Sequence, residues 1–213
     1  MRILGGKLSP FVMRCVLAAR LKGKELPVEM PAGGLKSADY LALNPMGKMP
    51  VLVNADFAIP ESAVIVEYLD EVLDGPKLLP EAPEARAMVR LLARMGELYL
   101  MPGLSPIFNA RANPDGVAEG VAKMADALRC LEAMRPAHMR CMAGDEPTLA
   151  DATLMPIFFF LDAFDRPFGT ARLLEATPGL AAWWADRKAT GLGAQMMEEM
   201  GAALAAFMAP KPA

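Results

Sequence analysis

The sequence predicts an α/β domain at the N-terminus followed by an all-α helical domain. Three observations predict this architecture. Strand-like and helix-like patterns alternate over the first third of the chain, a stretch rich in proline and glycine follows at residues 75–83, and the apolar residues beyond it recur at helical spacing. We therefore expect one domain over residues 1–78 and a helical domain over residues 86–213.

The first third predicts the element order βαβαββα. Ser9 is a good N-cap, and Pro10 suits the first position of a helix, where its missing N–H costs nothing. Glycine at position 23 ends that helix. The expected strands are Arg2–Gly5, Leu26–Met30, Val51–Val53 and Phe57–Ile59, and the two further helices are expected at Lys36–Leu41 and from about Glu61.

The remainder reads as helices separated by proline and glycine. Thr148 and Asp151 have the spacing of a capping box, with Asp in place of the usual Glu or Gln, so we expect Asp151 to be structural. We expect Met101–Gly103 to interrupt the first long helix. The expected helices are Glu84–Tyr99, Leu104–Asn109, Val117–Met134, Ala152–Phe164, one opening at Pro178 and one over residues 194–208.

Composition excludes several classes of function. The net charge is −3 and the isoelectric point about 5.3, so no basic excess exists to bind nucleic acid. The apolar run Leu154–Leu161 is far shorter than the roughly 20 residues of a membrane span, and the N-terminus lacks an apolar signal region. Three cysteines without metal-binding spacing fit a reducing, cytoplasmic location.

The most informative stretch is Asn44–Asp70. Pro50 directly precedes a strand, where a cis bond would turn the backbone of Met49 outward to pair with a peptide-like ligand. Glu61 and Ser62 then open a helix, whose free N–H groups favour an anion. This combination suits a small, acidic, extended peptide.

The spacing from Asn44-Pro45 through Lys48-Met49-Pro50 to Glu61-Ser62 resembles the glutathione-binding segment of the cytosolic glutathione S-transferase family. The resemblance implies a thioredoxin-like N-terminal domain, a helical C-terminal domain that carries a hydrophobic substrate site, and a role in detoxification. It also implies glutathione as co-substrate or cofactor, with no metal. The family is usually dimeric, and we expect the dimer contact on helix Glu84–Tyr99.

Ser9 is the candidate catalytic residue. The run Ser9-Pro10-Phe11-Val12-Met13-Arg14 resembles the serine-type members, especially the tau-like branch, beside zeta-like, theta-like and bacterial relatives. A hydroxyl at the start of a helix can stabilise the glutathione thiolate by a hydrogen bond, and the helix dipole adds to that effect. Arg14 is expected to be a structural ion-pair partner.

The resemblance also assigns the remaining contacts. Glu61 and Ser62 would hold the γ-glutamyl end, Met49 beside Pro50 would pair with the cysteinyl backbone, and Lys36 and Lys48 would face the glycyl carboxylate. A hydrophobic electrophile would contact a loose, methionine-rich wall. Its candidate residues are Phe11, Tyr99, Pro102, Phe108 and Arg111.

Other functions on the same fold remain open. Zeta-like members isomerise their substrate and regenerate glutathione, and bacterial relatives cleave aryl ethers or remove halide. A non-catalytic module that binds ligands or proteins is an alternative from another class. Thiol transfer through Cys15 is less favoured, because position 9 is Ser and Cys15 has no C-x-x-C partner. His138, the single histidine, is expected at the surface.

Overall fold

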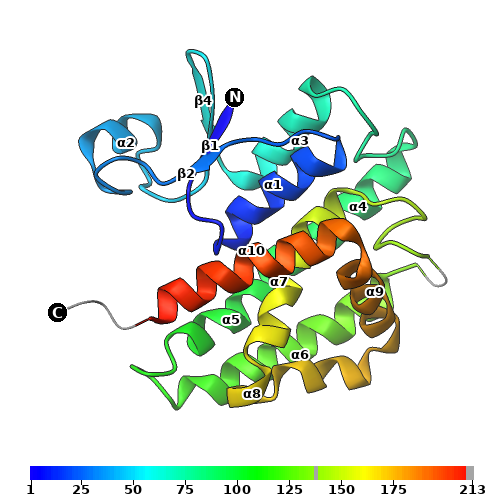
Figure 1. Cartoon of the computed structure of the whole chain (residues 1–213). Coiled ribbons are helices and arrows are strands. Elements are labelled where there is room, and N and C mark those ends of the chain that lie inside the picture. The colour runs from blue at the N-terminus through cyan, green and yellow to red at the C-terminus, as the bar shows by residue number, and fades with distance from the viewer. Residues whose placement is uncertain (137–138, 210–213) are drawn as a thin grey trace. The chain divides into compact units, whose positions relative to one another are not determined.

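The computed structural model describes residues 1–136 and 139–209, so His138 lies outside the described residues. The chain divides into two compact units (Figure 1). The first unit comprises Met1–Leu78 together with the C-terminal stretch from Ala194, and the second comprises Leu79–Gly193. The expected domain limits, 1–78 and 86–213, stay a prediction.

The first unit is built on a four-stranded sheet of order β2-β1-β3-β4. Strand β1 (Arg2–Leu4) pairs in parallel with β2 (Val28–Glu29) and antiparallel with β3 (Val51–Asn54). Strand β4 (Phe57–Pro60) pairs antiparallel with β3, with Leu52 opposite Ile59. The crossover and the hairpin therefore give the βαβ and ββα halves that the sequence predicts.

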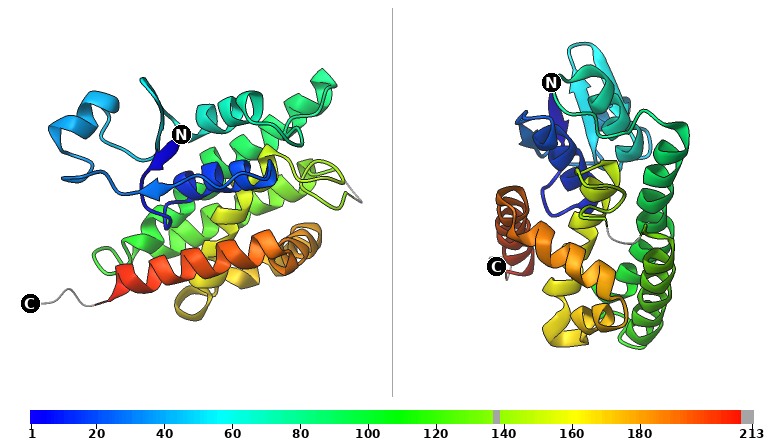
Figure 2. Two further views of the ribbon diagram at one scale, coloured as in Figure 1. Left: turned by 45° about the horizontal axis from the view of Figure 1, so that its top comes forward. Right: turned by 90° about the vertical axis from the view of Figure 1, so that its right-hand side faces the viewer.

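Helices α1 (Pro10–Leu21) and α3 (Ser62–Val72) pack against each other, and α2 (Ala38–Leu43) follows β2. Every residue of α1 from Val12 to Ala19 is buried. One reason is that α10 (Gly191–Met208) also lies next to α1, as Figure 2 shows. Helix α10 begins in the second unit and continues into the first.

The second unit consists of helices. Helix α7 is its most buried element, because all residues from Leu149 to Leu161 are buried. The elements in order are α4 (Pro83–Met95), the π-helical turn η1 (Gly96–Leu100), α5 (Met101–Phe108), α6 (Gly116–Met134), α7 (Leu149–Ala163), α8 (Asp165–Phe168), the 3₁₀ helix η2 (Thr170–Ala176) and α9 (Pro178–Ala189). Neither α8 nor η2 was expected from the sequence.

The expected interruption at Met101–Gly103 is wrong, because the chain stays helical from α4 through η1 into α5. The N–H of Met101 donates to the carbonyl oxygen of Gly96, five residues back. This wider turn changes the hydrogen-bond register just before Pro102, the residue that would otherwise break a regular helix. Helix α5 then continues to Phe108.

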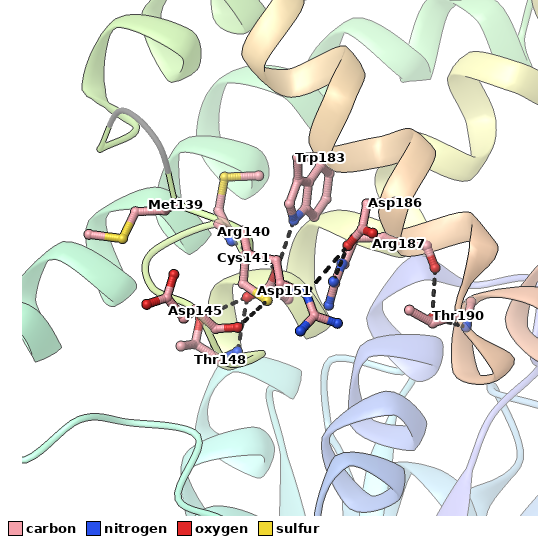
Figure 3. Close-up of polar contacts among 12 residues, drawn as sticks. Met139, Arg140, Cys141, Asp145, Thr148, Asp151, Trp183, Asp186, Arg187 and Thr190 are labelled. Atoms are coloured by element: carbon pink, nitrogen blue, oxygen red, sulfur yellow. Dashed lines mark hydrogen bonds and ion pairs between the residues drawn. The ribbon is translucent and has the colours of Figure 1, made fainter.

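The capping box at the start of α7 is confirmed. Asp151 is fully buried, and its carboxylate accepts from the backbone N–H of Thr148 at 2.9 Å and from the indole N–H of Trp183 at 2.8 Å (Figure 3). The expected structural role of Asp151 agrees with these contacts. Within the described residues, no helix combines the length and the apolar character needed to cross a membrane.

Candidate functional site

Ser9 lies between β1 and α1 and caps α1. Its Oγ accepts from the N–H of Val12 at 3.4 Å, and its backbone carbonyl accepts from the N–H of Met13 at 2.9 Å. The side chain is half-buried, with Pro10 at the first helical position. The hydroxyl therefore sits at the positive end of α1, where it can still donate its proton to an anion.

The Met49-Pro50 peptide bond is cis. The Met49 side chain packs beneath the loop after β1, and its Sδ lies 3.3 Å from the N–H of Gly6. Within the described parts of the chain, neither the N–H nor the C=O of Met49 has a hydrogen-bond partner. Both backbone groups are thus available to an extended, peptide-like ligand.

Two side chains that were not predicted as site residues, Tyr40 and Asn44, hold the segment before Met49 in place. The hydroxyl of Tyr40 and the side-chain amide of Asn44 each donate to the carbonyl oxygen of Lys48 at 2.7 Å. Tyr40 and Asn44 are both almost fully buried. The signal in the sequence was Asn44 at the head of the motif, whereas nothing local marked Tyr40.

Glu61 and Ser62 stand at the start of α3. Glu61 has φ of 67°, a left-handed conformation that is uncommon for a residue other than glycine and is often found at functional sites. Ser62 is buried, and its Oγ accepts from a guanidinium N–H of the buried Arg14. Among the described residues, the N–H groups of Ser62 and Ala63 have no partner, so they are open to a carboxylate.

Lys36 and Lys48 are both exposed and close in space. A Cβ added to Gly47 would lie 2.7 Å from the Lys36 Nζ, so the ammonium group rests on the backbone just before Lys48. Arg14, the expected ion-pair partner, also has its guanidinium 5.5 Å from the Phe11 ring. The first unit thus holds the predicted site residues Ser9, Met49, Ser62 and both lysines. Met49 contacts the loop that carries Ser9, and Lys36 contacts the segment that carries Lys48 and Met49.

Two of the residues proposed for the hydrophobic substrate line a pocket of about 540 Å³ in the second unit. Tyr99 and Pro102 form one side of it, and α6 forms the other. Phe108 points elsewhere, with its ring 4.9 Å from Phe160, and Arg111 is exposed outside this pocket. The lining residues are Met95, Leu98, Tyr99, Pro102, Lys123, Asp126, Ala127, Cys130 and Met134.

Cys15 is unsuited to thiol chemistry. Burial raises the pKa of its thiol to about 12, and the nearby Arg14 offsets this only in part. The thiol donates to the carbonyl oxygen of Phe11 at 3.4 Å. Because the thiolate is the reactive form, this environment makes Cys15 inert at neutral pH. In the part of the chain that the structure describes, no group of three or more metal-binding side chains occurs.

The fold is a thioredoxin-like domain, with the backbone groups of Met49 open beside the cis proline, followed by an all-helical domain. The family model "Glutathione S-transferase, N-terminal domain" matches residues 8–72, and "Glutathione S-transferase, C-terminal domain" matches residues 97–187. The chain belongs to the glutathione S-transferase family. The expected fold class is confirmed.

Curated relatives and solved structures agree with this assignment. The chain is 34% identical to maize (Zea mays) glutathione transferase GST 23 over 188 residues, which covers 86% of this chain and 82% of that protein. It is 36% identical to a probable glutathione S-transferase, BZ2, also from maize, over 86% of this chain and 84% of that protein. The expectation of a bacterial member stays a prediction.

Among solved structures, a tau-class glutathione S-transferase from mango (Mangifera indica) superposes with a TM-score of 0.81. The two sequences are 28% identical, and the match covers 98% of each chain. A glutathione S-transferase-I with bound lactoylglutathione gives a TM-score of 0.80 at 26% identity, over 93% of this chain and 99% of that one.

Proposed function

We propose that this protein is a glutathione transferase in which Ser9 stabilises the thiolate of bound glutathione. The thiolate sulfur attacks an electrophilic carbon of a hydrophobic substrate, a carbon–sulfur bond forms, and the leaving group departs with the bonding electrons. Glutathione is the co-substrate. The observation that carries the proposal is the Ser9 hydroxyl at the positive end of α1, on the loop that packs on Met49.

The proposed binding mode uses polar groups near the Ser9 loop that have no partner among the described residues, together with nearby charged side chains. The free N–H and C=O of Met49 pair with the cysteinyl backbone of glutathione. The Ser62 hydroxyl and the first N–H groups of α3 bind the γ-glutamyl carboxylate, while Glu61 binds the ammonium group. Lys36 and Lys48 attract the glycyl carboxylate as exposed cations.

The energetic demand on Ser9 is moderate. A free thiol with a pKa of about 8.5 is mostly protonated at neutral pH. Lowering that pKa by two requires about 2.7 kcal/mol of selective stabilisation of the thiolate. One hydrogen bond to a charged acceptor supplies about 1.5–3 kcal/mol, and the helix dipole adds to it.

The test follows the ultraviolet absorbance of the bound thiolate against pH in wild type and Ser9→Ala. We expect the glutathione thiol to ionise well below its free pKa in wild type and to return towards about 8.5 in the variant. Ser37→Ala is the matched control, because Ser37 also caps a helix and accepts from the N–H of Tyr40 at 3.3 Å.

An unperturbed thiol in the wild-type complex would reject the transferase mechanism. If the thiol pKa in Ser9→Ala is lowered as much as in wild type, only the role of Ser9 is rejected. Consumption of glutathione in proportion to product separates conjugation from isomerisation, which regenerates glutathione.

We propose Phe11, Tyr99, Pro102, Phe108 and Arg111 as contacts of the hydrophobic substrate. Phe11 is half-buried two residues after Ser9, which supports its place beside the reacting sulfur. Tyr99 is 58% exposed and Phe108 40% exposed, so both rings offer apolar surface to a ligand.

We also infer a homodimer in the cytoplasm. Apolar side chains on α4 and η1 are exposed, with Leu91 at 41% and Leu98 at 51%. Large exposed apolar surfaces typically mark interaction sites. The three cysteines are free thiols, as expected in a reducing compartment.

The dimer is tested by light scattering. We expect a mass of twice the 22.8 kDa chain for wild type and a shift towards the single chain for Leu98→Glu, because a charge would be buried in the contact. Phe207→Glu is the control, since Phe207 is also exposed but lies on α10. A Leu98→Glu protein that keeps the wild-type mass would place the contact elsewhere.

A further inference from the structure

The loop Gly5–Ser9 contains the proposed catalytic serine, and few backbone hydrogen bonds hold this loop in position. The N–H of Gly5 donates to the Glu29 carbonyl at 2.9 Å, and the N–H of Ser9 donates to the Gly6 carbonyl at 3.0 Å. Among the described residues, the N–H of Gly6 finds only the thioether sulfur of Met49 as an acceptor, and such a sulfur accepts weakly. Within the described residues, the N–H groups of Lys7 and Leu8 have no partner. Side-chain contacts therefore matter for the position of this loop.

One such contact joins the loop to the C-terminal helix. The ammonium group of Lys7 donates to Oε1 of Glu199 at 2.9 Å, across a separation of 192 residues in the sequence. Glu199 lies in the part of α10 that belongs to the first unit. Its side chain is 19% exposed and that of Lys7 is 40% exposed, so the pair is partly shielded from water.

Glu199 is itself held from the other end of α1. Arg20, in the last turn of that helix, donates to both carboxylate oxygens of Glu199, at 2.8 and 3.0 Å. The Arg20 side chain is 6% exposed, and its Nε also donates to Glu25. A forked arginine–carboxylate pair fixes the carboxylate in orientation as well as in place. Glu199 thus connects the loop before α1 with the end of α1.

The electrostatics agree with a charged, well-held carboxylate. Burial disfavours the ionised form of Glu199, but the hydrogen bonds from Arg20 and Lys7 outweigh that effect and lower its pKa. The carboxylate is therefore ionised at the pH values where glutathione reacts. The neighbouring Glu198 is exposed and has no such partners among the described residues.

We propose that Glu199 is a positioning residue, which holds Lys7 and through it the Gly5–Ser9 loop, so that the Ser9 hydroxyl stays directed at the glutathione sulfur. This inference rests on the proposed function. It adds that a residue of the C-terminal helix α10 helps to position the catalytic serine. Glu199 touches neither glutathione nor electrophile. When the contact between Lys7 and Glu199 is removed, we expect the Ser9 hydroxyl to be directed at the glutathione sulfur in a smaller fraction of molecules.

The experiment measures the pKa of the bound glutathione thiol in Lys7→Met and Glu199→Gln. An ion pair of this exposure changes an equilibrium by at most about fivefold. We therefore expect each variant to raise the thiol pKa by up to about 0.7, with the double variant no worse than the stronger single one. The dissociation constant of glutathione should change little, because its proposed contacts with Met49, Glu61 and Ser62 are intact.

Two controls accompany these variants. Glu198→Gln makes the same charge change one residue away on α10 and should leave the thiol pKa unchanged. Lys7→Arg keeps a cation that can reach Glu199 and should restore the wild-type value. Circular dichroism of every variant establishes that the first unit is folded.

The sign of the Glu199→Gln effect separates positioning from a direct charge effect. Removing a nearby negative charge would by itself favour the thiolate and lower the thiol pKa. Positioning by Glu199 predicts the opposite, a rise. Suppose that the thiol pKa falls or stays the same in Glu199→Gln, while Ser9→Ala still abolishes the activation of the thiol. That result would overturn the role of Glu199 and leave the proposed function standing. A wild-type thiol that is not activated would instead overturn the proposed function.

Discussion

The carboxylate of Asp151 accepts four hydrogen bonds at a position with no exposure to water. Its donors come from three segments: the N–H of Met142, the N–H and hydroxyl of Thr148, and the indole of Trp183. Thr148 closes the capping box locally, whereas Trp183 lies 32 residues after Asp151 in the chain. One side chain therefore joins the start of α7 to α9.

Asp151→Asn should be strongly destabilising. The substitution keeps the shape, but the new NH₂ group must face one of the N–H donors, which leaves buried groups unpaired. We expect a loss of about 3–5 kcal/mol in the free energy of unfolding, measured by urea denaturation. Asp145→Asn, in the loop before α7 and exposed, is the control and should change stability by less than about 0.5 kcal/mol. Equal effects of the two substitutions would contradict the structural role of Asp151.

At the scale of elements, α5 and α6 approach each other through two glycines. A Cβ added to Gly103 would lie 2.7 Å from the Gly120 carbonyl oxygen, and one added to Gly120 would lie 2.6 Å from the Gly103 carbonyl oxygen. The side chain of Met124 is closer still to the Cβ at Gly103, but it is flexible, whereas the two carbonyl oxygens are backbone and cannot turn away. The close approach of these two helices thus depends on the absence of side chains at both positions.

Gly103→Ala should therefore destabilise the protein, although alanine is the better helix former. We expect a cost of about 1–3 kcal/mol from overpacking, and each kcal/mol lowers the melting temperature of a chain of this size by about 2–4 °C. Gly201→Ala in α10 is the matched control, because nothing lies within 4 Å of its added Cβ. There the gain in helix propensity should raise stability by about 0.5–1 kcal/mol. A stabilised Gly103→Ala protein would show that the helices can separate at no cost.

Across the whole molecule, the features that could be predicted from the sequence are those that depend on residues close together in the chain. Ser9-Pro10 gives the start of α1, and Thr148 with Asp151 gives the start of α7. The cis bond before Pro50, which the sequence left open, comes from the structure. The continuous helix through Pro102 was not predictable. It depends on the π-helical turn at Gly96, where an added Cβ would lie 2.5 Å from Leu154, a contact between helices that are far apart in the sequence.

The same reasoning applies to the candidate site. The Asn44–Ser62 motif could be recognised because its residues are close in sequence and act through the backbone and a helix N-terminus. Lys7 and Glu199 carry no such signal, since each reads alone as an ordinary surface charge. Only the folded chain brings Glu199 next to Arg20 and Lys7. The roles of the predicted site residues stay a prediction until the thiol measurements are made.

The link between α10 and the start of the chain should also weaken in acid. The pKa of Glu199 is lowered in the folded protein, because the hydrogen bonds from Arg20 and Lys7 exceed the opposing effect of burial. A carboxyl whose folded pKa lies below its ordinary value of 4.5 stabilises the protein fully above that value. The contribution is lost as the pH falls through the folded pKa. Among the described residues, the charged groups that face Glu199 are Lys7 and Arg20, and Arg20 also pairs with Glu25.

This predicts how Glu199→Gln changes stability with pH. The variant should be less stable than wild type at neutral pH, and the difference in the free energy of unfolding should shrink below pH 4.5. Urea denaturation of both proteins over this range measures it, with Glu198→Gln as the control for a charge removed from α10. A difference that stays constant into acid would mean that Glu199 contributes through packing. The C-terminal helix would then be held by packing, and the ion pair between Lys7 and Glu199 would contribute little to the free energy of unfolding.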